Sequence, residues 1–402
     1  MASSLMSCSA AAPPRPPAGG RSTLTQRQSR QGRVRHGICQ IMGVLALFGA
    51  VFTIPPAVAD GVRDLRLSVN GEDRRYVVVT PEGVSGPVPV VIALHGAAQT
   101  PESFRAYFGL DAAAAAHGFV AVYPEGEGRV WNDGRPAAMR LKMVLRPGDD
   151  VAFLVALARS LAEQGIADPA RIYLTGISNG GFMVQRMACE HAELFAAYSS
   201  IMATAPANYR EECKPDRPVP IQFIHGTADS VIAYSGFWTP VGATLSAPES
   251  ARLFARINGC GASTQRELPH LDLTDVTAAT LRRWDNCRDG SAVELISIER
   301  GGHQPPARVD TKPDLATPFL GLRGRDVDSG EEIWRFMSAF GGTGAVPPRL
   351  GAVTPASRPG AVAAPSRPVA VPLPPQSPLR GNRTDAVVRP AASADQRGIS
   401  AQ

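Results

Sequence analysis

The chain has 402 residues and a formal net charge of +5, from 41 basic and 36 acidic side chains. Residues 1–59 carry six arginines and no acidic residue, and residues 341–402 carry seven arginines and two aspartates. Residues 60–340 therefore carry six more acidic than basic side chains. The basic overall charge is thus no argument for a nucleic-acid partner.

Residues 1–59 have the pattern of a secretory signal. A cluster of arginines precedes the apolar run 41–54, and the small residues Ala57-Val58-Ala59 follow it. The run has 14 residues, fewer than the ~20 that a membrane-spanning helix needs. We expect a signal peptide over 1–59, no membrane span in the mature chain, and a secreted or periplasmic protein.

The other end of the chain has a different composition. Residues 341–402 contain eleven prolines among Ala, Val, Arg and Ser, without periodicity. Proline blocks helices and removes the N–H groups that strand ladders use. This composition predicts a Pro/Ala-rich disordered tail over 341–402.

Residues 60–340 alternate between strand-like and helix-like segments. In chain order the strands are expected at 65–69, 75–79, 88–94, 171–175, 220–225 and 293–298, and the helices at 150–164, 181–188 and 247–257. The first two strands read as antiparallel, and Ser329 to Glu332 reads as the capping box that opens a last helix. The alternation predicts a single α/β domain with a mostly parallel sheet and helices on both faces.

The most informative motif is Gly176-Ile177-Ser178-Asn179-Gly180, which lies between a strand and a helix. This arrangement is the nucleophile elbow of the α/β-hydrolase fold, where small residues allow a sharp turn that presents the serine. We therefore expect Ser178 to be the nucleophile.

The fold places an acid and then a histidine after the serine. The apolar segment 220–225 runs into Gly226-Thr227-Ala228-Asp229, and the alternating segment 293–298 is followed by Gly301-Gly302-His303. We expect Asp229 to orient His303, which takes the proton of Ser178 and returns it to the leaving group.

Other histidines and acids fit these roles less well. His95, His225 and His117 each precede a glycine and are expected to shape turns or a helix end. His36 lies in the leader, and His191 and His270 precede no matching strand signal. The acids Asp272, Asp275, Asp285 and Asp289 are read as solvated loop charges.

A serine hydrolase also needs donors for the oxyanion of its tetrahedral intermediate, and backbone N–H groups in a dry cleft serve best. One is expected from Asn179, directly after the nucleophile, and the other from the loop after strand 88–94. In that loop Ala97 is the expected donor and Ala98 the alternative. A plain strand-to-helix turn is the competing interpretation.

The six cysteines divide between the leader and the body. Cys8 and Cys39 belong to the leader, and an exported compartment permits the other four to form disulfides. Neighbouring positions favour Cys189–Cys213 and Cys260–Cys287 among the three pairings that four cysteines allow. Their spacing does not match a zinc site.

Seven motifs occur in an order that resembles the polyhydroxybutyrate depolymerase and feruloyl esterase-like family of secreted α/β-hydrolases. They are Leu94-His95-Gly96, Tyr123-Pro124-Glu125-Gly126, Trp131-Asn132-Asp133-Gly134-Arg135, residues 149–154, residues 176–181, residues 225–229 and Gly301-Gly302-His303. The resemblance covers roughly residues 62–340 and implies a serine carboxylesterase with Ser178, Asp229 and His303 as its triad.

The chain departs from the family after the histidine. Family members often carry Trp-Pro there, whereas this chain has Gln304-Pro305-Pro306. We expect Trp131 and Trp238 to supply aromatic substrate-binding surface instead, with ordinary packing as the alternative.

These observations predict an exported serine esterase without a cofactor. Its substrate is a small or polymeric ester: a feruloyl or acetyl ester on polysaccharide, or a short polyhydroxyalkanoate ester. A serine peptidase of the same fold and a catalytically silent binding protein of the cell envelope are the alternatives. Comparing aryl esters with aryl amides tests the first, and labelling by a fluorophosphonate tests the second.

Overall fold

The computed structural model describes residues 61–135, 148–239, 242–309 and 317–341. The expected signal peptide over 1–59 lies outside the described residues. So does the expected tail, apart from Gly341.

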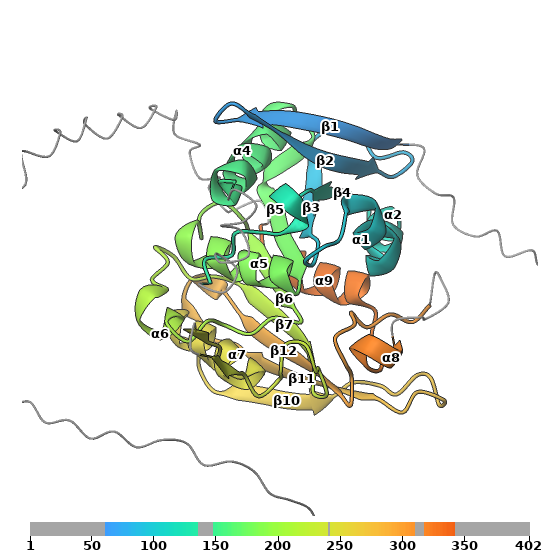
Figure 1. Cartoon of the computed structure of the whole chain (residues 1–402), viewed down its shortest axis with the longest axis vertical. Helices are drawn as coiled ribbons and strands as arrows, with labels where there is room; N and C mark the ends of the chain where they lie inside the picture. The colour runs from blue at the N-terminus through green and yellow to red at the C-terminus, as the bar shows by residue number, and fades with distance from the viewer. Residues whose placement is uncertain (1–60, 136–147, 240–241, 310–316, 342–402) are drawn as a thin grey trace, which may run out of the picture. The chain divides into compact units, whose positions relative to one another are not determined.

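A twisted ten-stranded sheet forms the centre of the molecule (Figure 1). Its spatial order is β1-β2-β4-β3-β5-β6-β7-β12-β11-β10. The strands are β1 (Gly61–Val69), β2 (Glu72–Thr80), β3 (Val88–Leu94), β4 (Val120–Pro124), β5 (Ala167–Ile177), β6 (Ala197–Ile201), β7 (Ile221–Gly226), β10 (Ser263–Glu267), β11 (Ala278–Trp284) and β12 (Val293–Glu299). The central strands from β4 to β12 pair in parallel, and both ends are antiparallel. The predicted α/β-hydrolase sheet is confirmed.

Helices cover both faces of the sheet. The described helices are α1 (Pro101–Phe108), α2 (Leu110–His117), α4 (Asp150–Glu163), α5 (Asn179–Glu190), α6 (Tyr209–Glu212), α7 (Ala247–Ile257), α8 (Thr317–Leu320) and α9 (Ser329–Met337), with short 3₁₀ turns at Glu127–Arg129 and Arg288–Gly290 and a hairpin of β8 (Trp238–Thr239) and β9 (Gly242–Ala243).

The two faces can be traced along β3, whose side chains alternate between two cores. Ile92 belongs to the core that includes side chains of α4, α5 and α7, whereas Val91 belongs to the core that includes those of α1, α2 and α9. Because successive side chains of a strand point to opposite faces, the apolar run of β3 fills both cores at once. This explains why the strand is apolar throughout rather than alternating.

The predicted capping box of the last helix is wrong by one residue. Asp328 is the N-cap of α9, and its carboxylate accepts a hydrogen bond from the Glu331 N–H. The Ser329 hydroxyl instead donates to the Pro306 carbonyl at 2.8 Å. Ser329 therefore lies in the first turn of the helix and ties it to the segment after His303.

Both expected disulfides are present. Cys189–Cys213 joins the end of α5 to the residue after α6, and Cys260–Cys287 joins the segment after α7 to the turn before β12. Disulfides persist in oxidising compartments, so they are consistent with an extracellular protein. Across the described ranges, no helix has the length and apolar character to cross a bilayer.

Candidate active site

Ser178 lies at the sharp turn between β5 and α5. Its φ and ψ are 55° and −120°, a backbone conformation that L residues rarely adopt. A β-carbon on Gly176 would lie 2.7 Å from the Gly180 backbone, and one on Gly180 would lie 2.5 Å from the Leu94 carbonyl oxygen. The two glycines are therefore required for β5, α5 and β3 to approach this closely. Strain at a turn of this kind is typical of functional sites.

The carboxyl ends of the neighbouring strands β7 and β12 bring Asp229 and His303 together. The His303 Nδ1 lies 2.7 Å from the Asp229 Oδ2. The Asp229 Oδ1 accepts hydrogen bonds from the N–H groups of Val231 and Ile232, each at 2.8 Å. Asp229 and His303 are both buried. Because parallel strands present their carboxyl ends at one edge, this pair lies at the same edge of the sheet as Ser178.

The charge state of Asp229 determines which nitrogen of His303 carries its proton. Burial raises the pKa of this carboxyl, but hydrogen bonds from His225, His303 and the Ile232 N–H outweigh it and hold the pKa well below its usual range. An ionised carboxylate can only accept hydrogen bonds. The His303 Nδ1 must therefore be the donor, which leaves its Nε2 lone pair available to take a proton.

The loop after β3 lies against the nucleophile. A β-carbon on Gly96 would lie 3.5 Å from the Ser178 Cβ. The Ala98 N–H donates to the Arg129 carbonyl at 2.8 Å, so this group is already used. The Ala97 N–H makes no hydrogen bond to any residue that the structure describes. The Asn179 N–H opens α5, where the first N–H groups of a helix have no intrahelical partner.

The two tryptophans lie in opposite environments. Trp131 is fully buried, so the structure does not support its expected role as exposed aromatic surface. Its indole packs against His95 and donates to the His95 carbonyl. Trp238 is 77% exposed in the β8–β9 hairpin. Its substrate-binding role stays a prediction.

Other histidines and acids considered for the triad form hydrogen bonds that serve other parts of the structure. The His225 Nε2 lies 2.8 Å from the Ile232 carbonyl and 3.3 Å from the Asp229 Oδ2, so His225 holds the loop of Asp229. Asp272 and Asp275 accept hydrogen bonds within the loop between β10 and β11. His117 ends α2 before the left-handed Gly118, as expected.

Sequence reasoning missed the side-chain role of Asn179. The Asn179 Oδ1 accepts from the Trp131 N–H at 2.7 Å, and its Nδ2 donates to the Trp131 carbonyl and to the buried Asp133. Asp133 also pairs with Arg135, whose guanidinium lies over the Phe182 ring of α5. The motif at 131–135 thus supports the elbow helix. In the sequence, the one hint of this role was the pair of polar residues Asn132 and Asp133 between Trp131 and Arg135.

Comparison with known proteins finds relatives that are named esterases. The pattern of the prolyl oligopeptidase family matches residues 112–208. "Putative esterase NocK" of Nocardia uniformis subsp. tsuyamanensis is 29% identical over 269 residues, covering 62% of this chain and 76% of that protein. Feruloyl esterase B of Piromyces equi is 27% identical over 243 residues, covering 57% of this chain and 42% of that protein.

A third relative is poly(3-hydroxyalkanoate) depolymerase C of Paucimonas lemoignei, 29% identical over 126 residues, which are 30% of this chain and 29% of that protein. The matches thus span less than half of the feruloyl esterase and of the depolymerase. Among solved structures, an acetyl xylan esterase from Aspergillus awamori is similar at 14% identity and a TM-score of 0.46, over 69% of this chain and 99% of that one.

A mostly parallel sheet with a strained serine between β5 and α5 defines an α/β-hydrolase, and its esterase relatives place the chain among the carboxylic ester hydrolases. The chain is similar to α/β-hydrolases that include feruloyl esterases and a polyhydroxyalkanoate depolymerase.

Proposed function

We propose that the protein is a serine carboxylesterase in which Ser178 is the nucleophile, His303 the general base and acid, and Asp229 the residue that orients His303. The Ala97 and Asn179 N–H groups bind the oxyanion. The observation that carries this proposal is the 2.7 Å distance between the His303 Nδ1 and the Asp229 Oδ2, at the sheet edge where Ser178 follows β5.

The chemistry follows from this arrangement. The Ser178 hydroxyl gives its proton to the His303 Nε2 as its oxygen bonds to the ester carbonyl carbon. The carbonyl oxygen becomes an oxyanion between the two N–H donors. Its collapse breaks the bond to the alkoxy oxygen, which leaves as the alcohol with the proton from His303. Water then attacks the acyl-enzyme by the same steps, releasing the carboxylic acid and restoring Ser178.

Two exposed apolar side chains belong to segments whose backbones bind Asp229 and His303, and they bear on the substrate. Val231, whose N–H binds the Asp229 carboxylate, is 50% exposed. Phe319 of α8 is 79% exposed, and the next residue, Leu320, accepts a hydrogen bond from the His303 N–H. These side chains support an ester with apolar groups near the reacting carbonyl: a feruloyl ester, an acetyl ester on polysaccharide, or a short hydroxyalkanoate ester, as the names of the relatives suggest.

The test is a substrate panel with a matched variant. Methyl ferulate, hydroxybutyrate oligomers, p-nitrophenyl esters of increasing acyl length and the corresponding aryl amides are offered to the wild type and to Ser178→Ala. We expect turnover of esters far above amides, and a loss of several orders of magnitude in Ser178→Ala. Faster amide turnover would favour the peptidase, and failure of a fluorophosphonate to label the wild type would favour the silent binding protein.

We also propose that the protein is exported by a signal peptide within residues 1–59. The basic and apolar pattern of that segment and the two disulfides of the body support this. N-terminal sequencing of protein collected outside the cytoplasm tests it. We expect a start near Asp60, and an intact residue 1 on the exported chain would refute cleavage.

A further inference from the structure

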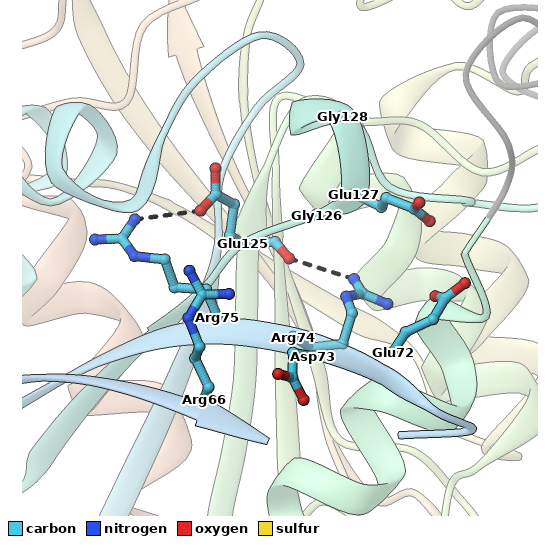
Figure 2. Close-up of a pocket in the computed structure, with 9 residues that line it drawn as sticks. All are labelled: Arg66, Glu72, Asp73, Arg74, Arg75, Glu125, Gly126, Glu127 and Gly128. Carbon is cyan, nitrogen blue, oxygen red and sulfur yellow. Dashed lines mark hydrogen bonds and ion pairs between the residues drawn. The ribbon is translucent and has the colours of Figure 1, made fainter. Parts of the chain in front are cut away.

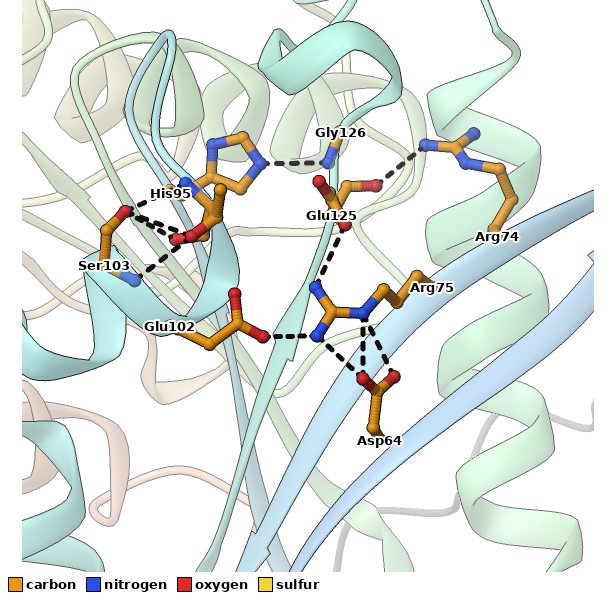
Figure 3. Close-up of polar contacts among 9 residues, drawn as sticks. Asp64, Arg74, Arg75, His95, Glu102, Ser103, Glu125 and Gly126 are labelled. Carbon is orange, nitrogen blue, oxygen red and sulfur yellow. Dashed lines mark hydrogen bonds and ion pairs between the residues drawn. The ribbon is translucent and has the colours of Figure 1, made fainter.

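The ring of His95 is held in one tautomer. His95 follows β3 and is fully buried, and burial lowers its pKa. The Gly126 N–H, which can only donate, points to the His95 Nε2 at 2.9 Å (Figure 3). The Nε2 must therefore be the unprotonated nitrogen. The Nδ1 then carries the proton and donates to the Gly96 carbonyl oxygen at 2.7 Å.

This hydrogen bond fixes the direction of the proposed oxyanion donor. The Gly96 carbonyl and the Ala97 N–H belong to the same peptide group, which is planar and trans, so the two bonds point in opposite directions. Holding the carbonyl toward the buried imidazole turns the Ala97 N–H away from it. The Gln99 N–H also donates to this carbonyl, at a longer 3.3 Å. Of these two hydrogen bonds to the Gly96 oxygen, the one from His95 is the shorter.

Trp131 connects this loop to the second proposed donor. Its indole N–H donates to the His95 carbonyl at 2.9 Å, and its backbone N–H donates to the Asn179 Oδ1 at 2.7 Å. The Asn179 Nδ2 returns a bond to the Trp131 carbonyl at 3.1 Å. The buried chain His95–Trp131–Asn179 thus runs from the residue before Gly96 to the residue that bears the second donor.

The Gly126 end of this arrangement is anchored by charge. Arg74 and Arg75 reach from β2 to the turn after β4, where they bind the Glu125 carbonyl and carboxylate (Figure 2). They lie on the wall of an open groove of about 430 Å³. Arg75 also pairs with Asp64 and Glu102 (Figure 3).

Behind this wall Gly126 has no room for a side chain. A β-carbon there would lie 2.9 Å from the Val130 carbonyl oxygen and 3.2 Å from the Trp131 ring. The close approach of Val130 and Trp131 on one side, and the Arg74 bond to the Glu125 carbonyl on the other, therefore fix the backbone that carries the Gly126 N–H.

We propose that His95, Trp131 and Asn179 are positioning residues, a buried clamp that sets the direction and separation of the Ala97 and Asn179 N–H groups. The proposal rests on the proposed esterase function. It predicts that the donor on the His95 ring controls turnover of bound substrate rather than substrate binding, because an oxyanion forms only after attack.

Two substitutions of His95 separate the two nitrogens. In His95→Asn the amide N–H₂ takes the place of Nδ1 and can still donate to the Gly96 carbonyl. In His95→Gln the amide oxygen takes the place of Nε2 and accepts from Gly126, but the donor to Gly96 is lost. We expect His95→Gln to lower kcat on a p-nitrophenyl ester by about 10²–10³-fold with KM nearly unchanged, the range for one lost oxyanion donor. His95→Asn should recover most of that loss.

Trp131→Phe keeps an aromatic ring but removes the indole N–H that binds the His95 carbonyl. It tests the same proposal if His95→Gln does not fold. It should also lower kcat with little effect on KM. Inhibition by a trifluoromethyl ketone, which forms an oxyanion on Ser178, should weaken by the same factor as kcat/KM in each variant.

The outcomes separate the two proposals. A wild type that hydrolyses no ester and resists the fluorophosphonate would refute the esterase function itself. An active wild type with His95→Asn as impaired as His95→Gln would refute the clamp alone. So would a folded His95→Gln or Trp131→Phe within threefold of wild-type kcat.

Discussion

Replacing Asp229 with asparagine should reverse the tautomer of His303 while leaving the fold in place. The Asp229 Oδ1 accepts two backbone N–H groups at 2.8 Å, so only an oxygen fits at that position. The amide N–H₂ of Asp229→Asn must then occupy the position of Oδ2, 2.7 Å from the His303 Nδ1. Facing a donor, Nδ1 becomes the acceptor and Nε2 carries the proton. It can no longer take the proton of Ser178.

We expect kcat on a p-nitrophenyl ester to fall by about 10³–10⁴-fold, the range for this exchange in a Ser-His-Asp triad. At 1.36 kcal/mol per tenfold change this corresponds to about 4–5.5 kcal/mol in the activation barrier. Asp272→Asn is the matched control, because Asp272 lies in an exposed loop and binds Thr274 rather than a histidine. A folded Asp229→Asn variant within tenfold of wild-type kcat, or an equal loss in Asp272→Asn, would refute the reasoning.

Three further predictions concern stability and the elbow. Because the pKa of Asp229 is held below its unfolded value of about 3.9, its ionised form stabilises the fold above that pH, and this contribution is lost as pH falls through the folded pKa. The difference in unfolding free energy between wild type and Asp229→Asn should therefore shrink below about pH 4, and a constant difference from pH 7 to 3 would contradict this. Replacing Cys260 and Cys287 with serine opens a loop of 27 residues. Chain entropy predicts that the free energy of unfolding, measured in denaturant, falls by about 3.6 kcal/mol. A loss under 1 kcal/mol would show that other contacts already hold the segment. Gly180→Ala would place a β-carbon 2.5 Å from the Leu94 carbonyl oxygen, so we expect kcat to fall at least tenfold or the chain to be insoluble, and a soluble variant with wild-type kcat would show that β3 can move.

Elements with strong local signals were predicted closely from the sequence. The strand over 88–94 and the helix over 247–257 have the expected bounds. The strand is a continuous apolar run, and the helix opens with Ser246 and Glu249 in a capping box, so both are specified by neighbouring residues. The pairings Cys189–Cys213 and Cys260–Cys287 also followed from proximity along the chain.

Features that depend on distant contacts were predicted poorly. Asp328 and Ser329 both fit the start of α9, and the choice depends on Pro306, which takes the Ser329 hydroxyl. For Trp131 the sequence allowed either substrate-binding surface or ordinary packing, and the structure buries it. Its polar contacts are with His95 and Asn179, which are 36 and 48 residues away. A pattern within one segment carries no information about such partners. The roles of Ser178, Asp229 and His303 stay predictions until the variants are measured.

The two disulfides imply that cysteine oxidation accompanies the formation of a stable proposed active site. One bridge begins in α5, the helix that Ser178 opens, and the other ends just before β12, the strand that leads to His303. The two bridges therefore constrain the helix after the nucleophile and the segment that leads to the strand before the base. A chain folded in a reducing host would lack both constraints, so thiol oxidation is a determinant of yield as much as of stability.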